Sequence, residues 1–190
     1  MDKNKDKKQT YVLRVLMMIS TVVLIILFFA TMSMVGKIQG TARVVNYAGL
    51  VRGKTQRIIK MEDAGQEEDA MIDDVAAFID GLRNGSDSLN RLDDYAFQSK
   101  MEELDDYFQS LEQEIYLVRE KGYENSEIIA KSEQFFQICD EATGLAEAYS
   151  QRKASALNIL EKIVMADIAI LIGILGIELF KALRYAAQNR

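Results

Sequence analysis

Two long apolar segments enclose a highly charged middle section, and this arrangement constrains the fold more than any other feature of the sequence. Residues 16–35 contain no charged side chain, and residues 163–180 are mostly apolar. Each segment is long enough to cross a bilayer as one α-helix. A secretory signal peptide is the alternative for the first segment, but that segment exceeds the usual apolar core of such a peptide and no clear cleavage site follows it. We therefore predict two transmembrane helices that contact membrane lipid.

Charges near these segments predict how the chain crosses the membrane. Residues 1–15 carry five Lys or Arg side chains, and residues 181–190 carry three. Because such residues accumulate on the cytoplasmic side, we expect both ends to be cytoplasmic, at the inner membrane of a bacterium. Residues 36–162 hold 25 Asp or Glu against 15 Lys or Arg, a net charge of −10, and we expect them to form one domain outside the cytoplasm.

Two acidic residues, Asp167 and Glu178, interrupt the second apolar segment. Acids inside a membrane are often functional. Each of these lies within about one turn of an end of the segment. We therefore expect them to reach the interface or to pair with the other membrane helix.

The middle section has the composition of an all-α domain. The chain contains no Pro, and residues 36–162 are rich in residues that favour helices. Apolar spacing predicts helices over residues 37–64, 66–82 and 89–121, and a fourth that begins near residue 125 and continues into the second apolar segment. Gly65 and Gly122 are placed to end the first and third helices. The predicted fold class is an all-α, antiparallel four-helix bundle outside the membrane, flanked by two transmembrane helices.

The same spacing predicts the core. The expected core positions are Ile72, Val75, Ile79 and Leu82 in the second helix, Leu92, Phe97, Met101, Leu104, Phe108, Leu111, Ile115 and Val118 in the third, and Ile128, Phe135, Cys139, Ala142, Ala146 and Tyr149 in the fourth.

Enzymatic chemistry has little support in the sequence. There is no His, the commonest general base and metal ligand, and Cys139 is the single Cys. The paired acids, such as Asp73 and Asp74, are adjacent on a helix and so point in different directions. We expect no enzymatic activity in this chain, no metal, no cofactor and no nucleic-acid partner. Cys139 is expected to be a buried apolar residue, with an intermolecular disulfide as the alternative.

The first helix of the middle section is basic although the rest of that section is acidic. Residues 37–61 contain six Lys or Arg and no Asp or Glu. On a helical projection Arg52 falls among the apolar positions, whereas the other cations mostly point elsewhere. A guanidinium on a packing surface needs a carboxylate or a bound anion beside it. The sequence leaves both partners open. The apolar positions around Arg52 are Val44, Val45, Ala48, Val51, Thr55 and Ile59.

Residues 46–57, N-Y-A-G-L-V-R-G-K-T-Q-R, resemble the first-helix motif of bacterial nitrate and nitrite sensor kinases and of pilus-type chemotaxis receptors, which also occurs ahead of diguanylate cyclase domains. The resemblance implies a periplasmic four-helix bundle that pairs as a homodimer, with Arg52 holding an anion at the interface. Thr55 would add a hydroxyl group. Gly53 and Lys54 depart from the family pattern. The supporting motif residues are Asn46, Ala48, Gly49 and Arg57.

The function expected from these features is a transmembrane signal-transduction sensor module. It would bind a small anion or another small solute outside the membrane and relay a helix shift to a cytoplasmic signalling domain or partner. Only ten residues follow Phe180, too few for an output domain, so the chain is either a fragment or signals through a partner. The alternative function is a non-sensory two-span helical scaffold that docks onto another envelope protein.

Overall fold

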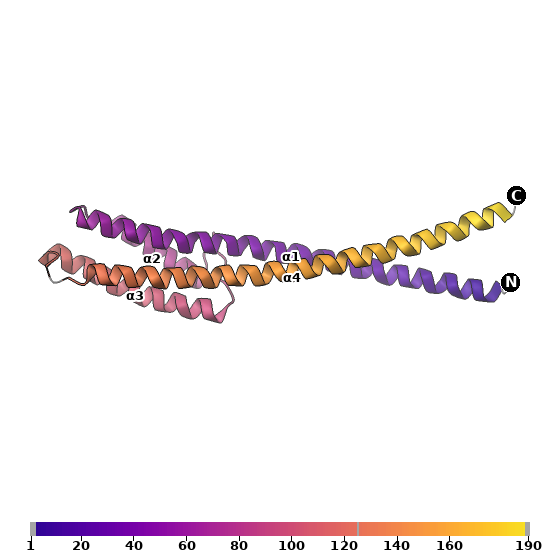
Figure 1. The fold of residues 1–190 in the computed structure, drawn as a ribbon, viewed down its shortest axis with the longest axis horizontal. Helices are drawn as coiled ribbons and strands as arrows, with labels where there is room; N and C mark the ends of the chain where they lie inside the picture. Colours follow the sequence, from indigo (N-terminus) through magenta and orange to yellow (C-terminus); the bar gives the residue numbers. More distant parts are fainter. Residues whose placement is uncertain (1–2, 125, 189–190) are drawn as a thin grey trace. The chain divides into compact units, whose positions relative to one another are not determined.

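The computed structural model describes residues 3–124 and 126–188 and shows four helices (Figure 1). They are α1 (Lys3–Asp63), α2 (Asp69–Asn84), α3 (Tyr95–Lys121) and α4 (Ile128–Gln188). The described residues form no strand, so the predicted all-α class is confirmed. Both α1 and α4 are 61 residues long and have no break. Each of these two helices also contains one of the predicted apolar segments.

The chain divides into two compact units. The terminal unit consists of Met1–Gly36 and Ala154–Arg190, and the central unit is Lys37–Lys153. The terminal unit therefore contains the first part of α1 and the last part of α4, whereas the central unit contains α2, α3 and the remainder of the two long helices.

The terminal unit consists of two long apolar helical segments. Both of its helices are long and apolar enough to cross a bilayer. Large apolar side chains are exposed on both, for example Phe29 on α1 and Ile172 on α4. Exposed apolar surface of this extent is unusual for a monomer in water.

One polar contact joins the two helices of the terminal unit. The hydroxyl group of Ser20 in α1 donates a hydrogen bond to Asp167 Oδ1 in α4 at 2.5 Å. Asp167 therefore pairs with the other apolar segment, one of the two expected outcomes. Within the described residues, the second carboxylate oxygen of Asp167 and Oε1 of Glu178 are buried without a hydrogen-bond partner.

One hydrophobic core occupies the central unit, and all four helices contribute to it. Every core position predicted for the second and third helices is buried. In the fourth helix five of the six predicted positions are buried, and Tyr149 packs at the edge of the core. Ring contacts connect the helices in pairs: Phe108 and Phe135 join α3 to α4 with centroids 5.6 Å apart, and Tyr47 and Phe78 join α1 to α2 at 5.1 Å. The periodicity therefore identified the inward faces correctly.

The predicted start of the third helix was wrong by six residues. The helix begins at Tyr95, where the Asp94 side chain accepts the Phe97 backbone N–H at 3.0 Å and caps the first turn. Residues 85–94 form an irregular connection instead, held partly by backbone hydrogen bonds between Ser86 and Leu89 in both directions. Leu92 is buried, as predicted, but it lies in this connection.

The second helix also begins three residues later than predicted, at Asp69. Backbone hydrogen bonds from Gly65 to Glu62 and from Gln66 to Met61 close the end of α1 and delay the next helix. Gly65 has φ 74° and Gly122 has φ 80°, so both predicted helix-ending glycines are confirmed.

An ion-pair cluster connects three helix ends of the central unit. Arg119 near the end of α3 donates two hydrogen bonds to Glu62 of α1, at 2.9 and 2.6 Å, and a third to Asp69 of α2 at 2.7 Å. The Glu62 side chain is 4% exposed and that of Arg119 is 15% exposed. This cluster fixes the α1–α2 connection against α3.

A second buried carboxylate holds the α3–α4 connection. Glu114 of α3 accepts hydrogen bonds from the Lys131 ammonium group and from the Glu127 backbone N–H, both at 2.9 Å. These two donors, Lys131 first, lower the pKa of Glu114 below its usual value of 4.5.

Candidate functional site

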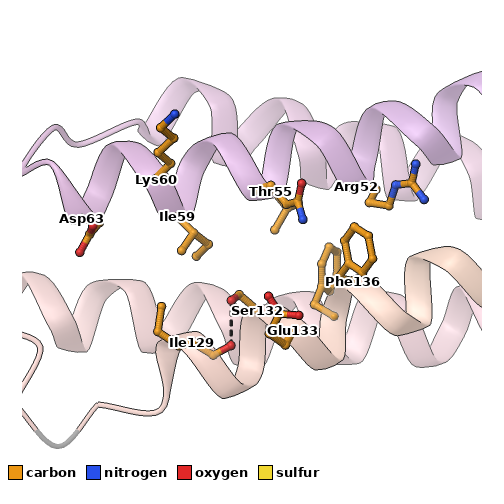
Figure 2. A pocket seen from close by; sticks show the side chains of 11 residues that line it. Arg52, Thr55, Ile59, Lys60, Asp63, Ile129, Ser132, Glu133 and Phe136 are labelled. Atoms are coloured by element: carbon orange, nitrogen blue, oxygen red, sulfur yellow. Dashed lines mark hydrogen bonds between the residues drawn. The ribbon is translucent and has the colours of Figure 1, made fainter.

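A groove of about 330 Å³ lies in the central unit between α1 and α4 (Figure 2). We call it the α1–α4 groove. Its lining residues are Arg52, Thr55, Gln56, Ile59, Lys60 and Asp63 from α1, and Ile129, Ser132, Glu133, Phe135 and Phe136 from α4.

Arg52 lies at one end of the groove and already has a carboxylate partner. Its Nη1 donates to Asp140 Oδ1 of α4, and its guanidinium lies over the Phe136 ring, 5.2 Å from the centroid. The two charged side chains are 39% and 51% exposed. Arg52 is therefore at the edge of the apolar face and is not desolvated inside it. An ion pair this exposed contributes at most about 1 kcal/mol to stability.

Thr55 lines the groove but does not offer its hydroxyl proton to a ligand. The residue is 2% exposed, and its hydroxyl group donates to the Val51 backbone carbonyl at 2.9 Å. The expectation that Thr55 donates a hydrogen bond to a ligand therefore does not fit this conformation. Its oxygen retains the capacity to accept one.

The four supporting motif residues do not line the groove. Asn46 and Arg57 are exposed, Ala48 belongs to the core, and Gly49 lies on the surface of α1, partly exposed. A methyl group added at Gly49 would meet no atom within 4 Å in the described protein. Of the six predicted site residues, the structure brings only Arg52 and Thr55 to the groove.

Sequence reasoning missed the α4 wall of the groove. Ile129, Glu133, Phe136 and Asp140 are spaced by four, three and four residues, so they share one face of α4. That spacing was readable in the sequence, but nothing there indicated that this face lies opposite Arg52.

The charges in the groove have both signs. Asp63 and Glu133 point into the gap between the two helices, whereas the Lys60 side chain points away from it (Figure 2). Within the described residues, neither carboxylate has a hydrogen-bond or ion-pair partner. Because Asp140 already compensates Arg52, the interior of the groove has an excess of negative charge.

Cys139 lies behind this wall of the groove, in the core of the central unit. It is 1% exposed, and burial raises the pKa of its thiol to about 12, although the positive charge of Arg52 acts in the opposite direction. A buried thiol with so high a pKa is unreactive at neutral pH. The structure therefore agrees with the prediction of a buried apolar residue.

The fold thus defines the chain as an all-helical protein with two helices able to cross a membrane. Comparison with protein-family models, with curated proteins and with solved structures found no match.

Proposed function

We propose that this chain is the transmembrane sensor module of a bacterial signalling protein. Residues 36–162 form an antiparallel four-helix bundle outside the inner membrane, and both termini are cytoplasmic. A small anion or another small solute binds in the α1–α4 groove, and the response passes to a cytoplasmic signalling domain or partner.

The observation that carries this proposal is the continuity of the two long helices. Each wall of the groove belongs to a helix that also contains an apolar segment able to cross a membrane, and neither helix is interrupted. A ligand that favours one arrangement of the walls would therefore act on the same two helices that enter the membrane. An unbroken helix transmits a small shift because its backbone hydrogen bonds resist local bending.

A homodimer is part of the proposal. Gly49 and Gly53 are four residues apart on α1, and a methyl group at either would meet no atom within 4 Å. This surface allows a second copy to approach closely. Occupancy of the groove would then also change how the two first helices pack against each other.

One observation favours the alternative scaffold function. Arg52 pairs with Asp140 of α4, as expected of a residue with a structural role. If the chain is a scaffold, replacing Arg52 changes stability or assembly, and no small molecule affects the protein.

The two functions separate in a ligand screen on the full chain in lipid nanodiscs. The reagent is a thiol label for Cys139, the only Cys, whose modification requires opening of the core. A ligand at 100 times its Kd stabilises the folded state by about 2.7 kcal/mol, which slows labelling roughly 100-fold. We would screen nitrate, nitrite, other small anions and metabolites.

Arg52→Ala is the test variant and Arg57→Ala is the matched control, because Arg57 is an exposed Arg of the same helix that does not line the groove. We expect a compound that slows labelling in the wild type and in Arg57→Ala but not in Arg52→Ala. If no compound slows labelling and Arg52→Ala alone accelerates it, the scaffold function is correct.

A further inference from the structure

We infer that the α1–α4 groove takes an α-amino acid with an apolar side chain, or a zwitterion of the same form, in preference to an inorganic anion. This inference rests on the proposed ligand-binding function of the groove and specifies its ligand class.

The volume of the groove suits an organic molecule better than an inorganic anion. The groove has a volume of about 330 Å³, at the lower end of the range for organic ligand sites. Water occupies about 30 Å³ per molecule in the liquid. A four-atom anion is only slightly larger and would leave most of the groove filled with solvent. A molecule of the size of leucine or phenylalanine fills far more of it.

The charged side chains of the groove suit a ligand that carries both a positive and a negative group. Glu133 and Asp63 point into the groove from opposite walls, and Lys60 points away (Figure 2). An anion held at Arg52 would meet the unpaired Glu133 carboxylate on the facing wall, which repels it, whereas Asp63 is eleven residues, about 16 Å, further along α1. A purely cationic ligand would leave the remaining N–H donors of Arg52 without an acceptor. A zwitterion places its ammonium group near Glu133 and its carboxylate near Arg52, so both ends are compensated.

The spacing of Glu133 and Arg52 along the groove suits the two charged groups of an amino acid. Glu133 precedes Phe136 by three residues on α4, and the Arg52 guanidinium lies over the Phe136 ring. Glu133 and the residue whose ring lies under Arg52 are therefore about one helical turn apart on α4, roughly 5 Å along the axis. Hydrogen bonds of about 2.9 Å from the adjacent ammonium and carboxylate groups of an amino acid cover such a separation.

Arg52 retains donors for a ligand carboxylate. A guanidinium has five N–H donors in a planar fork, and only Nη1 contacts Asp140. The groups at Nε and Nη2 remain for a second carboxylate, in the bidentate geometry that Arg favours. The amide group of Gln56, four residues further along α1, also lines the groove.

The apolar residues of the groove provide a surface for the ligand side chain. Ile59 and Ile129 point toward each other across the gap, and the Phe136 ring stands further along the groove, near Arg52 (Figure 2). Ile129 is 62% exposed. An apolar ligand side chain would remove this surface from water.

The test compares leucine and phenylalanine with analogues that lack one charge each. The full chain in nanodiscs is titrated with leucine, with 3-methylbutylamine, which lacks the carboxylate, with 4-methylpentanoate, which lacks the ammonium group, and with nitrate and nitrite. Binding is measured as slower labelling of Cys139 and checked by calorimetry. We expect leucine or phenylalanine to bind at least tenfold more tightly than either analogue and than nitrate or nitrite.

Glu133→Gln is the test variant, and Glu147→Gln is its control on an exposed position of α4 outside the groove. We expect Glu133→Gln to weaken the binding of the amino acid at least tenfold without weakening the binding of 4-methylpentanoate. Glu147→Gln should change the affinity for neither compound. Labelling of each variant without ligand verifies that it is folded.

The outcomes separate the two proposals. If nitrate or nitrite binds in an Arg52-dependent manner and no amino acid binds, the sensor function stands and the amino-acid inference is wrong. Equal binding of leucine and 4-methylpentanoate, or unchanged leucine binding in Glu133→Gln, also overturns the inference. If no compound binds, the groove is not a ligand site and both proposals fail.

Discussion

Replacing Arg119 by Ala should destabilise the central unit at the end that holds the α1–α2 connection. Arg119 compensates Glu62 with two hydrogen bonds, and the Glu62 side chain is only 4% exposed. In the variant this buried carboxylate would retain a single protein donor among the described residues, the Glu68 backbone N–H at 3.2 Å.

The magnitude follows from the burial of the pair. Removing one partner of a buried ion pair typically costs 3–5 kcal/mol. Arg119 is 15% exposed and its third hydrogen bond goes to the exposed Asp69, so we expect the lower end, about 3 kcal/mol. A free-energy change of about 1.4 kcal/mol corresponds to a factor of ten in an equilibrium constant. The equilibrium constant for opening of the core should therefore rise roughly 100-fold.

The assay is again labelling of Cys139 in the full chain. The conditions are chosen so that the opened core closes faster than the reagent reacts with the thiol. The rate then reports the opening equilibrium of the core that contains this thiol. The double variant Glu62→Leu with Arg119→Met removes both charges and should return the rate to within about tenfold of the wild type. If Arg119→Ala accelerates labelling less than about fivefold, or if the double variant is as unstable as the single one, the cluster is not a buried ion pair of this strength.

Three further changes have defined outcomes. Glu114→Gln should destabilise the central unit by about 1–3 kcal/mol near neutral pH, because it weakens the bonds from Lys131 and Glu127. The folded-state pKa of Glu114 is lowered, so its contribution is complete above pH 4.5 and disappears as the pH falls through the folded value. The variant and the wild type should therefore converge in acid denaturation, and a constant difference would contradict this. Ser20→Ala should reduce the yield of an engineered crosslink between the two apolar segments severalfold, because it removes the hydrogen bond to Asp167. A hydrogen bond between membrane helices contributes about 0.6–2 kcal/mol. An unchanged yield would contradict the pairing of Ser20 with Asp167. Gly122→Ala should cost about 1–3 kcal/mol in the Cys139 assay, because φ 80° with ψ 178° is a backbone conformation that essentially only Gly adopts. Beyond the neighbouring residues, nothing in the described part of the chain lies within 4 Å of the added methyl group, so backbone strain is the cause, and a neutral effect would show that the helix end relaxes.

Much of the fold could be predicted from the sequence because it depends on interactions between residues close in the chain. Apolar residues at three- and four-residue spacing identified the inward faces of α2 and α3, and glycines at positions 65 and 122 identified two helix ends. The start of α3 could not be predicted in the same way. Leu89 and Leu92 continue the apolar spacing, but both become buried from an irregular connection that ends at the Asp94 cap.

The candidate site was predicted only in part. The helical projection identified Arg52 as the cation on the apolar face, the motif resemblance implied a ligand there, and the structure places Arg52 beside a groove together with Thr55. The partners of Arg52 could not be predicted, because Phe136 and Asp140 are more than 80 residues away in the chain.

By itself, the sequence determined the helical class, the two apolar segments and the inward faces, because these depend on composition and on the 3.6-residue period of a single helix. Only the tertiary structure decided that Asp140 compensates Arg52 and that Glu133 and Asp63 share a groove with it. The physical reason is that the alignment of α4 against α1 depends on how the whole core packs and on the connections between helices. A shift of one helical turn, about 5.4 Å, would place different α4 residues opposite Arg52 without changing the pattern of either helix.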